Sequence, residues 1–224
     1  MKTLKAEGHE IVLAKAGAVL EPQGYKLRKG GTRYDKDGPE ISTSVQFYFK
    51  RSSNYEGFSK MTITFHKVEE IIAKVGLPDR VDLHKAQNRR LLRTLQDRSA
   101  VLEYDEGTGP ESTRVETIED FEQWGNAIAK YLQTDGRNFV EKYDNLPAVL
   151  REMDRFTSEG KKWFKGLIGG GAEYFFRGLI ISKLCNDPNY QDKVRLGDTS
   201  FAPNVGEEWA SYYEKYKEAL SSLR

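Results

Sequence analysis

The sequence predicts an α+β protein, in which an antiparallel β-meander of four to six strands carries helices on one face and continues into a C-terminal helical subdomain. Two observations lead to this prediction. The segments 41–50 and 58–66 alternate between apolar and polar side chains, as the strands of a half-covered sheet do. From residue 117 onward, apolar residues recur instead at spacings of three and four, which is typical of helices.

The composition is that of a globular protein. With 224 residues, 38% hydrophobic and 31% charged, the chain is long enough to bury a core and lies far from the composition of disordered proteins. The 35 basic and 34 acidic side chains leave a net charge of +1, which argues against a surface devoted to nucleic acid or anionic membrane. The segment 1–17 lacks an apolar signal core, and no run of 18 apolar residues occurs. We therefore expect a soluble, cytoplasmic protein.

The first third of the chain predicts a helix followed by strands. Residues 10–20 have a modest helical stripe that ends at Glu21-Pro22. Two short basic strands follow at about 25–29 and 32–36, with Gly30-Gly31 between them and Asp37-Gly38 after them.

The alternating segment 41–66 is the centre of the predicted sheet. One face carries Ile41, Thr43, Val45, Phe47, Phe49, Met61, Ile63 and Phe65, and the other carries Ser42, Ser44, Gln46, Tyr48, Lys50, Thr62, Thr64 and His66. A turn containing Asn54, Tyr55, Glu56 and Gly57 is expected between the two strands. Helices should cover the first face only, so the second face is expected to be solvated.

The middle of the chain is less regular. Residues 67–75 predict a short helix or a last piece of strand, which Pro78 ends. Residues 81–97 predict a helix with Lys85, Arg89 and Arg93 in one row. A strand at 100–104 and a loop at 105–112 complete the first of two regions, 1–115 and 116–224, which we expect to form one compact unit.

The second region predicts a series of helices. The first should begin at Thr117, with Asp120 completing a capping box, and should end at Asp135-Gly136. Helices at about 137–143 and 146–155 follow, the latter capped by Asn145. A glycine-punctuated connection at 160–171, a strongly apolar helix at 172–187, a loop at 193–205 and a last helix at 207–223 complete the chain.

This order of elements resembles a bacterial family known as domain of unknown function 4304. The resemblance covers about residues 8–155, and it is carried by a hairpin that begins Gly24-Tyr25-Lys26 and by Phe139, Tyr143 and Leu146 in the later helices. The chain departs from the family at Val101, Leu102 and Tyr104, where the family tends to have tryptophans. The resemblance implies a fold and no reaction, with a role in bacterial conflict or toxin immunity.

Two surfaces are candidates for binding a protein partner. The first is the polar sheet face with Gln46, Tyr48, Thr62, Thr64 and His66, for which a merely solvated sheet is the alternative. The second is the row Trp209, Tyr212, Tyr213 and Tyr216 on the last helix, for which burial in the core is the alternative.

A basic helix is the main argument for nucleic acid. Lys85, Arg89, Arg90 and Arg93, together with Lys26, Arg28, Lys29 and Arg33 of the hairpin, could neutralise several phosphates. Asp97, Glu103, Asp105 and Glu106 lie close by in the sequence, so a solvated charged face is the alternative.

No residue set predicts catalysis, a metal or a cofactor. Among the three histidines, His66 with Glu69 and Glu70 forms the candidate cluster of metal-ligand residue types, but their spacing matches no metal motif. The single cysteine, Cys185, lies on an apolar helical face and excludes an intramolecular disulfide. The glycines of 166–171 are not followed by the Lys-Ser or Lys-Thr of a phosphate-binding loop.

The sequence therefore predicts a non-catalytic protein of bacterial or phage origin that binds another protein, with toxin immunity or host–phage conflict as its setting. A nucleic-acid-binding protein that uses the basic helix is the alternative. Neither hypothesis involves a membrane, and the oligomeric state stays open at this stage.

Overall fold

The computed structural model describes residues 3–50, 54–78, 92–97, 112–164, 167–168 and 172–223. Internal contacts divide the chain into two units, Met1–Ile63 with Asp97–Lys142 and Thr64–Gln96 with Tyr143–Arg224. The chain therefore passes from one unit to the other at residues 63–64, 96–97 and 142–143, whereas the sequence-based division had a single boundary near residue 115. Each unit has its own core.

The first unit is built on an antiparallel sheet. Its strands are β1 (Lys26–Leu27), β2 (Arg33–Asp37), β3 (Ile41–Tyr48), β4 (Tyr55–Phe58) and β7 (Ser112–Arg114), which neighbour one another in that order. The strand β5 (Thr62–Phe65), which carries the chain into the second unit, also pairs with β3. Val45 lies opposite Tyr34, and Phe47 lies opposite Phe58. The predicted α+β fold with an antiparallel meander is confirmed.

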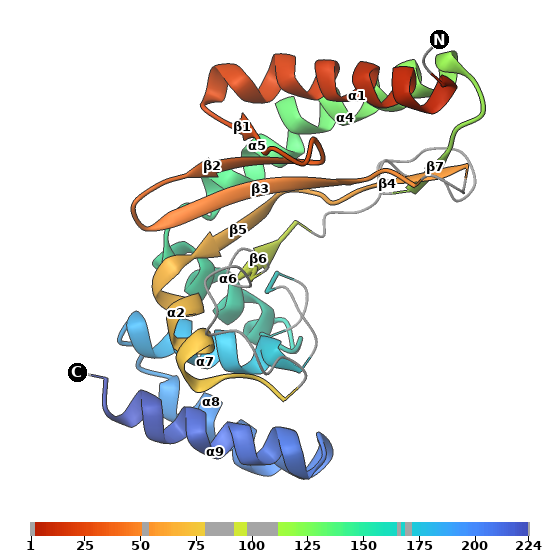
Figure 1. The fold of residues 1–224 in the computed structure, drawn as a ribbon. Helices are drawn as coiled ribbons and strands as arrows, with labels where there is room; N and C mark the ends of the chain where they lie inside the picture. Colours follow the sequence, from red (N-terminus) through yellow and green to blue (C-terminus); the bar gives the residue numbers. More distant parts are fainter. Residues whose placement is uncertain are drawn as a thin grey trace. The chain divides into compact units, whose positions relative to one another are not determined.

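Helices cover one face of this sheet. Figure 1 shows α1 (Leu4–Leu20) and α4 (Ile118–Gln133) side by side on the same side of the strands, with α5 (Asp135–Lys142) following α4. Val45, Phe47 and Phe58 are buried beneath them, and each such side chain contributes roughly 1.5–3 kcal/mol of transfer free energy. A Cβ on Gly8 would lie 2.2 Å from the Phe121 ring, so glycine is required where α1 crosses α4.

The predicted helix starts are confirmed. The Thr117 hydroxyl accepts the Asp120 backbone N–H at 3.1 Å, and the Asp120 carboxylate accepts the Thr117 backbone N–H at 2.8 Å, which is the expected capping box. In the second unit, the Asn145 side chain accepts the Ala148 backbone N–H at 3.0 Å at the start of α6. These local signals hold because a cap satisfies backbone groups within its own helix.

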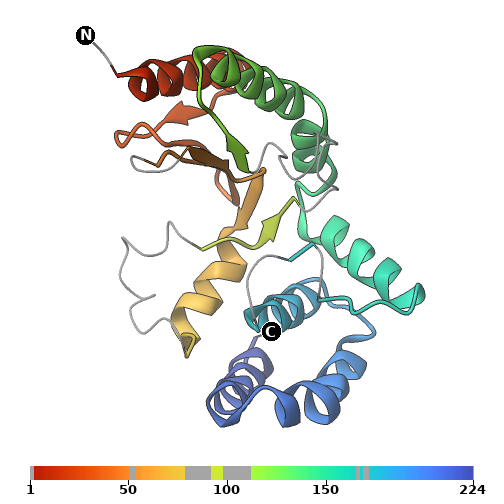
Figure 2. The same ribbon diagram turned by 90° about the vertical axis from the view of Figure 1, so that its right-hand side faces the viewer.

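The second unit is mostly helical, as the helices in the lower half of Figure 2 show. Phe175, Phe176, Ile180, Tyr213 and Tyr216 are among its fully buried residues. Its elements are α2 (His66–Val75), β6 (Leu95–Gln96), α6 (Leu146–Ser158), α7 (Glu173–Leu184), α8 (Tyr190–Leu196), the π-helix η2 (Gly197–Phe201), the 3-10 helix η3 (Ala202–Asn204) and α9 (Glu207–Ser221). The C-terminal helical region is confirmed.

Three local predictions are wrong. Residues 55–57 are not a turn but part of β4, where the buried Glu56 side chain contacts Lys5 and His9 of α1. Residues 193–205 are not a loop, since α8, η2 and η3 occupy most of them. The helix expected over 81–97 does not extend to residue 97. Leu95–Gln96 instead form the strand β6, and Leu95 pairs with Ile168 in an isolated β-bridge.

Two other predictions fall outside the described residues. These are the strand at 100–104 and most of the basic helix, including Lys85, Arg89 and Arg90. Over the ranges that the structure describes, no helix combines the length and the hydropathy needed to cross a bilayer.

Candidate functional site

The sheet of the first unit has a second face, which points away from α1 and α4. The register defines this polar face, because residues opposite one another in a ladder point the same way. It carries Arg33 and Asp35 of β2, Ser44, Gln46 and Tyr48 of β3, Tyr55 of β4, Thr62 of β5 and Arg114 of β7. The sequence-based face with Gln46, Tyr48 and Thr62 therefore exists in the first unit.

Ion pairs and hydrogen bonds connect the polar face at β2 and β3. Asp35 accepts hydrogen bonds from Arg28 and Arg33, each at 2.5 Å. Arg33 also donates to the Ser44 hydroxyl at 3.2 Å, and the Ser44 and Thr62 hydroxyls are 2.8 Å apart. The hydrogen bond from Arg28 to Asp35 raises the pKa of the guanidinium. Asp35, Ser44 and Thr62 in this part of the face are therefore already hydrogen-bonded to other side chains of the same unit.

Burial on the polar face is uneven. Ser44 is 8% exposed and Thr62 is 1% exposed, which corrects the expectation that both lie in solvent. The physical reason is their mutual hydrogen bond, which satisfies both hydroxyls away from water. Gln46 is half-buried, and its side-chain amide donates to the Thr32 hydroxyl and to the Phe47 carbonyl.

The exposed part of the polar face is an aromatic patch at one end of the sheet. Tyr48 is 43% exposed and Tyr55 is 48% exposed. Tyr48 lies opposite Gly57, so Tyr55 is its diagonal neighbour on β4, and Arg114 of β7 lies opposite Tyr55. The Arg114 side chain is 59% exposed and pairs with Glu116 at 2.6 Å. We call Tyr48, Tyr55 and Arg114 the tyrosine patch.

The other two residues of the predicted sheet site belong to the second unit. Thr64 is half-buried, and its hydroxyl donates to the Leu92 carbonyl at 2.9 Å. His66 is the first residue of α2 and is also half-buried. The positions of the Thr64 and His66 side chains are therefore set by contacts within the second unit and not by the strand pairing that positions Tyr48.

The aromatic row of α9 is largely core. Tyr213 and Tyr216 are 0% exposed, which corrects the expectation that they present a docking stripe. Tyr216 stacks on Phe176 at 4.3 Å between ring centroids, and burial raises the pKa of its hydroxyl. Trp209 and Tyr212 are half-buried, and the indole of Trp209 stacks on Phe176 at 5.8 Å. These aromatic side chains therefore pack α9 against the rest of the second unit.

Of the four residues of the predicted nucleic-acid site, only Arg93 is described. It is half-buried and lies outside any helix or strand. Lys85, Arg89 and Arg90 lie outside the described residues, so the basic row stays a prediction.

The acidic neighbours of His66 do not form a metal site in the described ranges. Glu69 is buried and accepts two hydrogen bonds from Arg177, at 2.8 and 2.9 Å, while Glu173 lies 3.2 Å from the same guanidinium. Burial lowers the pKa of Arg177, but the negative charges of Glu69 and Glu173 and their hydrogen bonds together outweigh it, so the net shift is upward. Glu69 is thus committed to a buried ion pair.

Sequence reasoning missed a charged cluster on the helix-covered face of the sheet. The Glu56 side chain is 0% exposed and lies 3.1 Å from His9 and 3.4 Å from Lys5, both on α1. Its other oxygen accepts the Lys50 backbone N–H at 2.8 Å. No signal in the sequence could have found the pair, because His9 and Glu56 are 47 residues apart.

The histidine–carboxylate pair resembles the base and orienting group of nucleophilic enzymes, but it needs a nucleophile to act. His9 stacks on Phe49 at 4.0 Å and hydrogen-bonds to Glu56 at 3.1 Å. Together with Lys5, this contact gives the buried Glu56 carboxylate polar partners where α1 meets β4.

The cysteine and the described part of the glycine connection are both in covered positions. Cys185 directly follows α7 and is half-buried, and burial together with the charge of Asp187 raises the pKa of its thiol, which disfavours the nucleophilic thiolate. Of the segment 166–171 only Leu167 and Ile168 are described, and both are buried. The phosphate-loop hypothesis concerns glycines that lie outside the described residues.

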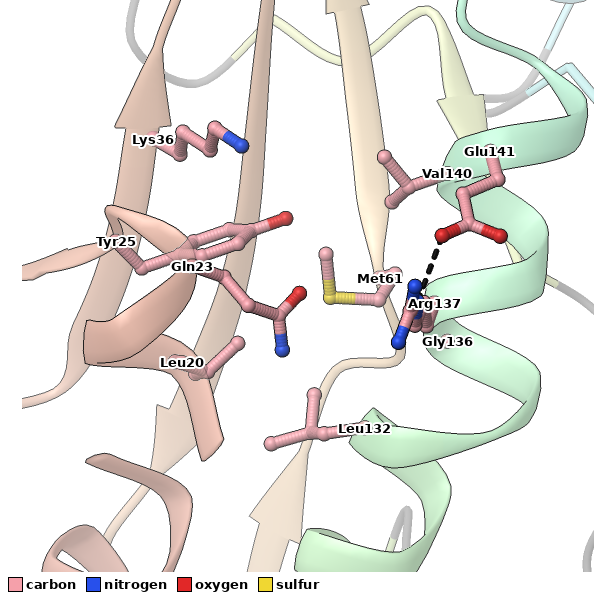
Figure 3. A pocket seen from close by; sticks show the side chains of 10 residues that line it. All are labelled: Leu20, Gln23, Tyr25, Lys36, Met61, Leu132, Gly136, Arg137, Val140 and Glu141. Atoms are coloured by element: carbon pink, nitrogen blue, oxygen red, sulfur yellow. Dashed lines mark hydrogen bonds and ion pairs between the residues drawn. The ribbon is translucent and has the colours of Figure 1, made fainter. Parts of the chain in front are cut away.

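A small cavity of about 130 Å³ lies on the helix-covered side of the first unit. Figure 3 shows Tyr25, Gln23 and Lys36 on one wall and Arg137 and Glu141 of α5 on the other, with Met61 between them. The Tyr25 hydroxyl accepts a hydrogen bond from Thr43, and Arg137 is paired with Glu141 at 2.7 Å. Its volume lies below the usual range of ligand pockets, about 300–1,000 Å³.

Comparisons of the chain with models of known protein families, with curated proteins and with solved structures gave no match. The resemblance to the bacterial family of unknown function therefore stays a prediction.

Proposed function

We propose that the protein is a non-catalytic binding protein whose protein partner docks on the tyrosine patch of the first unit. The observation that carries the proposal is the exposure of Tyr48 and Tyr55, 43% and 48%, on neighbouring strands of the same sheet face. Tyrosine and arginine are the residue types that dominate binding energy at protein interfaces, and the patch offers both.

The charges on this face favour a protein over a nucleic acid. Arg28 and Arg33 pair with Asp35, and Arg114 pairs with Glu116. A phosphate backbone needs cations whose charge is not already balanced, because affinity comes from counterion release. The mixed-sign polar surroundings of the aromatic rings are instead typical of a protein interface rim.

Site-specific photo-crosslinking tests the proposal. A benzophenone amino acid at position 48 or 55 should give a discrete protein adduct in cells that contain the gene's natural neighbours. The toxin-immunity role expected from the resemblance indicates which partner to test first, a toxin encoded next to this gene. The purified candidate should then bind the full-length chain and lose affinity for the Tyr48→Ala variant.

The matched control places the same crosslinker at Leu4, which is 44% exposed on α1 but lies in the helix layer, not on the polar face. Adducts of equal yield at positions 4 and 48 would contradict the proposal.

A single-stranded nucleic acid is the second candidate, because exposed aromatic rings on an antiparallel sheet can stack bases. Fluorescence anisotropy with a labelled single-stranded oligonucleotide separates the two candidates. Binding that weakens as salt rises and is lost in Tyr48→Ala would favour nucleic acid. The absence of binding at low salt would leave the protein partner as the conclusion.

A further inference from the structure

The second unit contains a cavity that the proposed docking surface does not use. Its volume is about 470 Å³, which falls within the range of small-molecule sites. Its lining residues come from three segments: the segment after α6, the start of α7, and the residues from Leu196 to Val205.

Aromatic rings form the walls of this cavity. Phe175 and Phe201 stack on each other with centroids 4.4 Å apart and planes 12° apart. Phe164 meets the ring of Phe175 edge-on at 5.2 Å, and Trp163 packs against both. Because each ring is fixed by another ring, the cavity presents a rigid apolar surface and not a collapsible gap.

The wall formed by η2 is held in an uncommon conformation. Single-turn π-helices are frequent at functional sites, and here the π-helix places Ser200 and Phe201 on the cavity. A Cβ on Gly197 would lie 2.3 Å from the Tyr213 hydroxyl, so glycine is required for this approach. That hydroxyl donates to the Val194 carbonyl at 2.8 Å, which fixes the end of α8. Buried Tyr213 therefore packs against η2 and holds this wall in place without lining the cavity.

The polar groups of the cavity lie among its exposed lining residues. Lys162, Ser200 and Asn204 are exposed and line it together with the apolar side chains. Lys162 is the cation among the lining residues, and across the described ranges no carboxylate side chain lines the cavity with it. The neighbouring Lys161, by contrast, pairs with Glu159 at 2.6 Å.

We propose that this cavity binds a small aromatic carboxylic acid, with the ring system against the half-buried rings of Phe164 and Tyr174 in the cavity lining and the carboxylate at Lys162. Charge complementarity selects an acid, because the lining adds positive and no negative charge to an apolar space. The ring walls select a flat aromatic body over an alkyl chain, since aromatic pairs gain affinity beyond the area that they bury. The site lies wholly in the second unit and is independent of the tyrosine patch.

Isothermal titration of the full-length protein with 2-naphthoate is the direct test. We expect saturable binding at one site. The uncharged 2-naphthamide should bind about threefold to fivefold more weakly, the range for an exposed ion pair. The saturated analogue, decahydro-2-naphthoate, should bind about twofold to tenfold more weakly because it cannot make ring–ring contacts.

Two matched pairs of variants locate the site. Lys162→Gln should reduce the affinity for 2-naphthoate about threefold to fivefold, whereas Lys161→Gln should not, because Lys161 does not line the cavity. Ser200→Asp adds a like charge to the lining and should weaken binding about tenfold or more, while Thr199→Asp on the same π-helix should have little effect. All four positions are exposed, so the variants should fold.

The proposal fails if 2-naphthoate shows no saturable binding at millimolar concentration. It also fails if Lys161→Gln and Lys162→Gln weaken binding equally, or if 2-naphthamide binds as tightly as the acid. None of these outcomes bears on docking at Tyr48, because the crosslinking experiment uses the other unit.

Discussion

Two sets of tyrosines, one on the sheet and one on α9, have opposite environments. Tyr48 and Tyr55 are 43% and 48% exposed, whereas Tyr213 and Tyr216 are both 0% exposed. Tyr48 belongs to a sequence pattern of period two, and Tyr213 and Tyr216 belong to one of helical spacing. In the strand, alternation assigns Tyr48 to the face opposite the apolar residues. In the helix, the tyrosines are themselves the apolar stripe.

The hydroxyl groups show how the second set tolerates burial. The Tyr216 hydroxyl donates to the Gly76 carbonyl at 2.9 Å, and the Tyr213 hydroxyl donates to the Val194 carbonyl at 2.8 Å. A buried tyrosine costs little when its polar tip has such a partner. A row of tyrosines on a helix can therefore belong to the core where each hydroxyl has a backbone carbonyl within reach.

The largest expected effect is the loss of a buried ring. Tyr216→Ala should lower the free energy of unfolding of the second unit by about 3–5 kcal/mol, because it removes a ring stacked on Phe176 and leaves a cavity. Tyr216→Phe keeps the ring and should cost only about 0.5–1.5 kcal/mol for the lost hydrogen bond. Urea unfolding followed by the fluorescence of Trp163 and Trp209 measures both changes. Equal losses in the two variants would show that the ring is not packed.

A buried tyrosine in the first unit should have an intermediate effect. The Tyr131 hydroxyl donates to Asp97 at 2.6 Å and accepts the Met61 backbone N–H at 2.9 Å. Tyr131→Phe removes both bonds, one of them to a carboxylate, and should cost about 1–3 kcal/mol. Unfolding followed by Trp124, which belongs to the same unit, measures the loss. A neutral result would indicate that water replaces the hydroxyl.

Alkaline pH should destabilise the protein through the same buried hydroxyls. Burial and the negative charge of Asp97 raise the pKa of Tyr131, and burial raises that of Tyr216. The unfolded chain ionises its tyrosines near pH 10, so the stability that these groups contribute is complete below about pH 10 and is lost as pH rises further.

The phenylalanine variants isolate this effect. Each buried tyrosine should contribute a slope of about 1.4 kcal/mol per pH unit well above pH 10. Tyr131→Phe and Tyr216→Phe should each remove about 1.4 kcal/mol of the total loss in stability between pH 9 and 11. An unchanged slope in both variants would mean that these hydroxyls ionise in the folded protein as they do in the unfolded chain.

Much of the fold follows from local signals in the sequence. The capping box at Thr117, the cap at Asn145 and the alternation over 41–48 each depend on neighbours within a few residues, and the structure has them where they are expected. The strand at 55–58 could not be predicted, because it depends on Glu56 meeting α1 residues far away in the sequence. The segments that make up each unit could not be read from the sequence for the same reason, since each unit combines distant segments.

The candidate sites were less predictable than the fold. Alternation placed Tyr48 on the polar face, but it could not show that Thr62 is buried there and hydrogen-bonded to Ser44. Tyr55 was missed because it was assigned to a turn. The aromatic cavity was missed because it depends on a π-helix over 197–201, and a π-helix has no periodic signature in this segment.

The smallest effect on stability should come from the exposed pair. Tyr48→Ala combined with Tyr55→Ala should change the free energy of unfolding of the first unit by no more than about 0.5 kcal/mol per site, as surface substitutions usually do. Position 44 lies on the same face but cannot serve as an exposed site for comparison, because Ser44 is buried. A loss above about 2 kcal/mol would mean that the rings pack within the folded chain, and the contrast with Tyr213 and Tyr216 would disappear. Unchanged stability together with a lost partner would mean that the rings contribute to binding and little to folding.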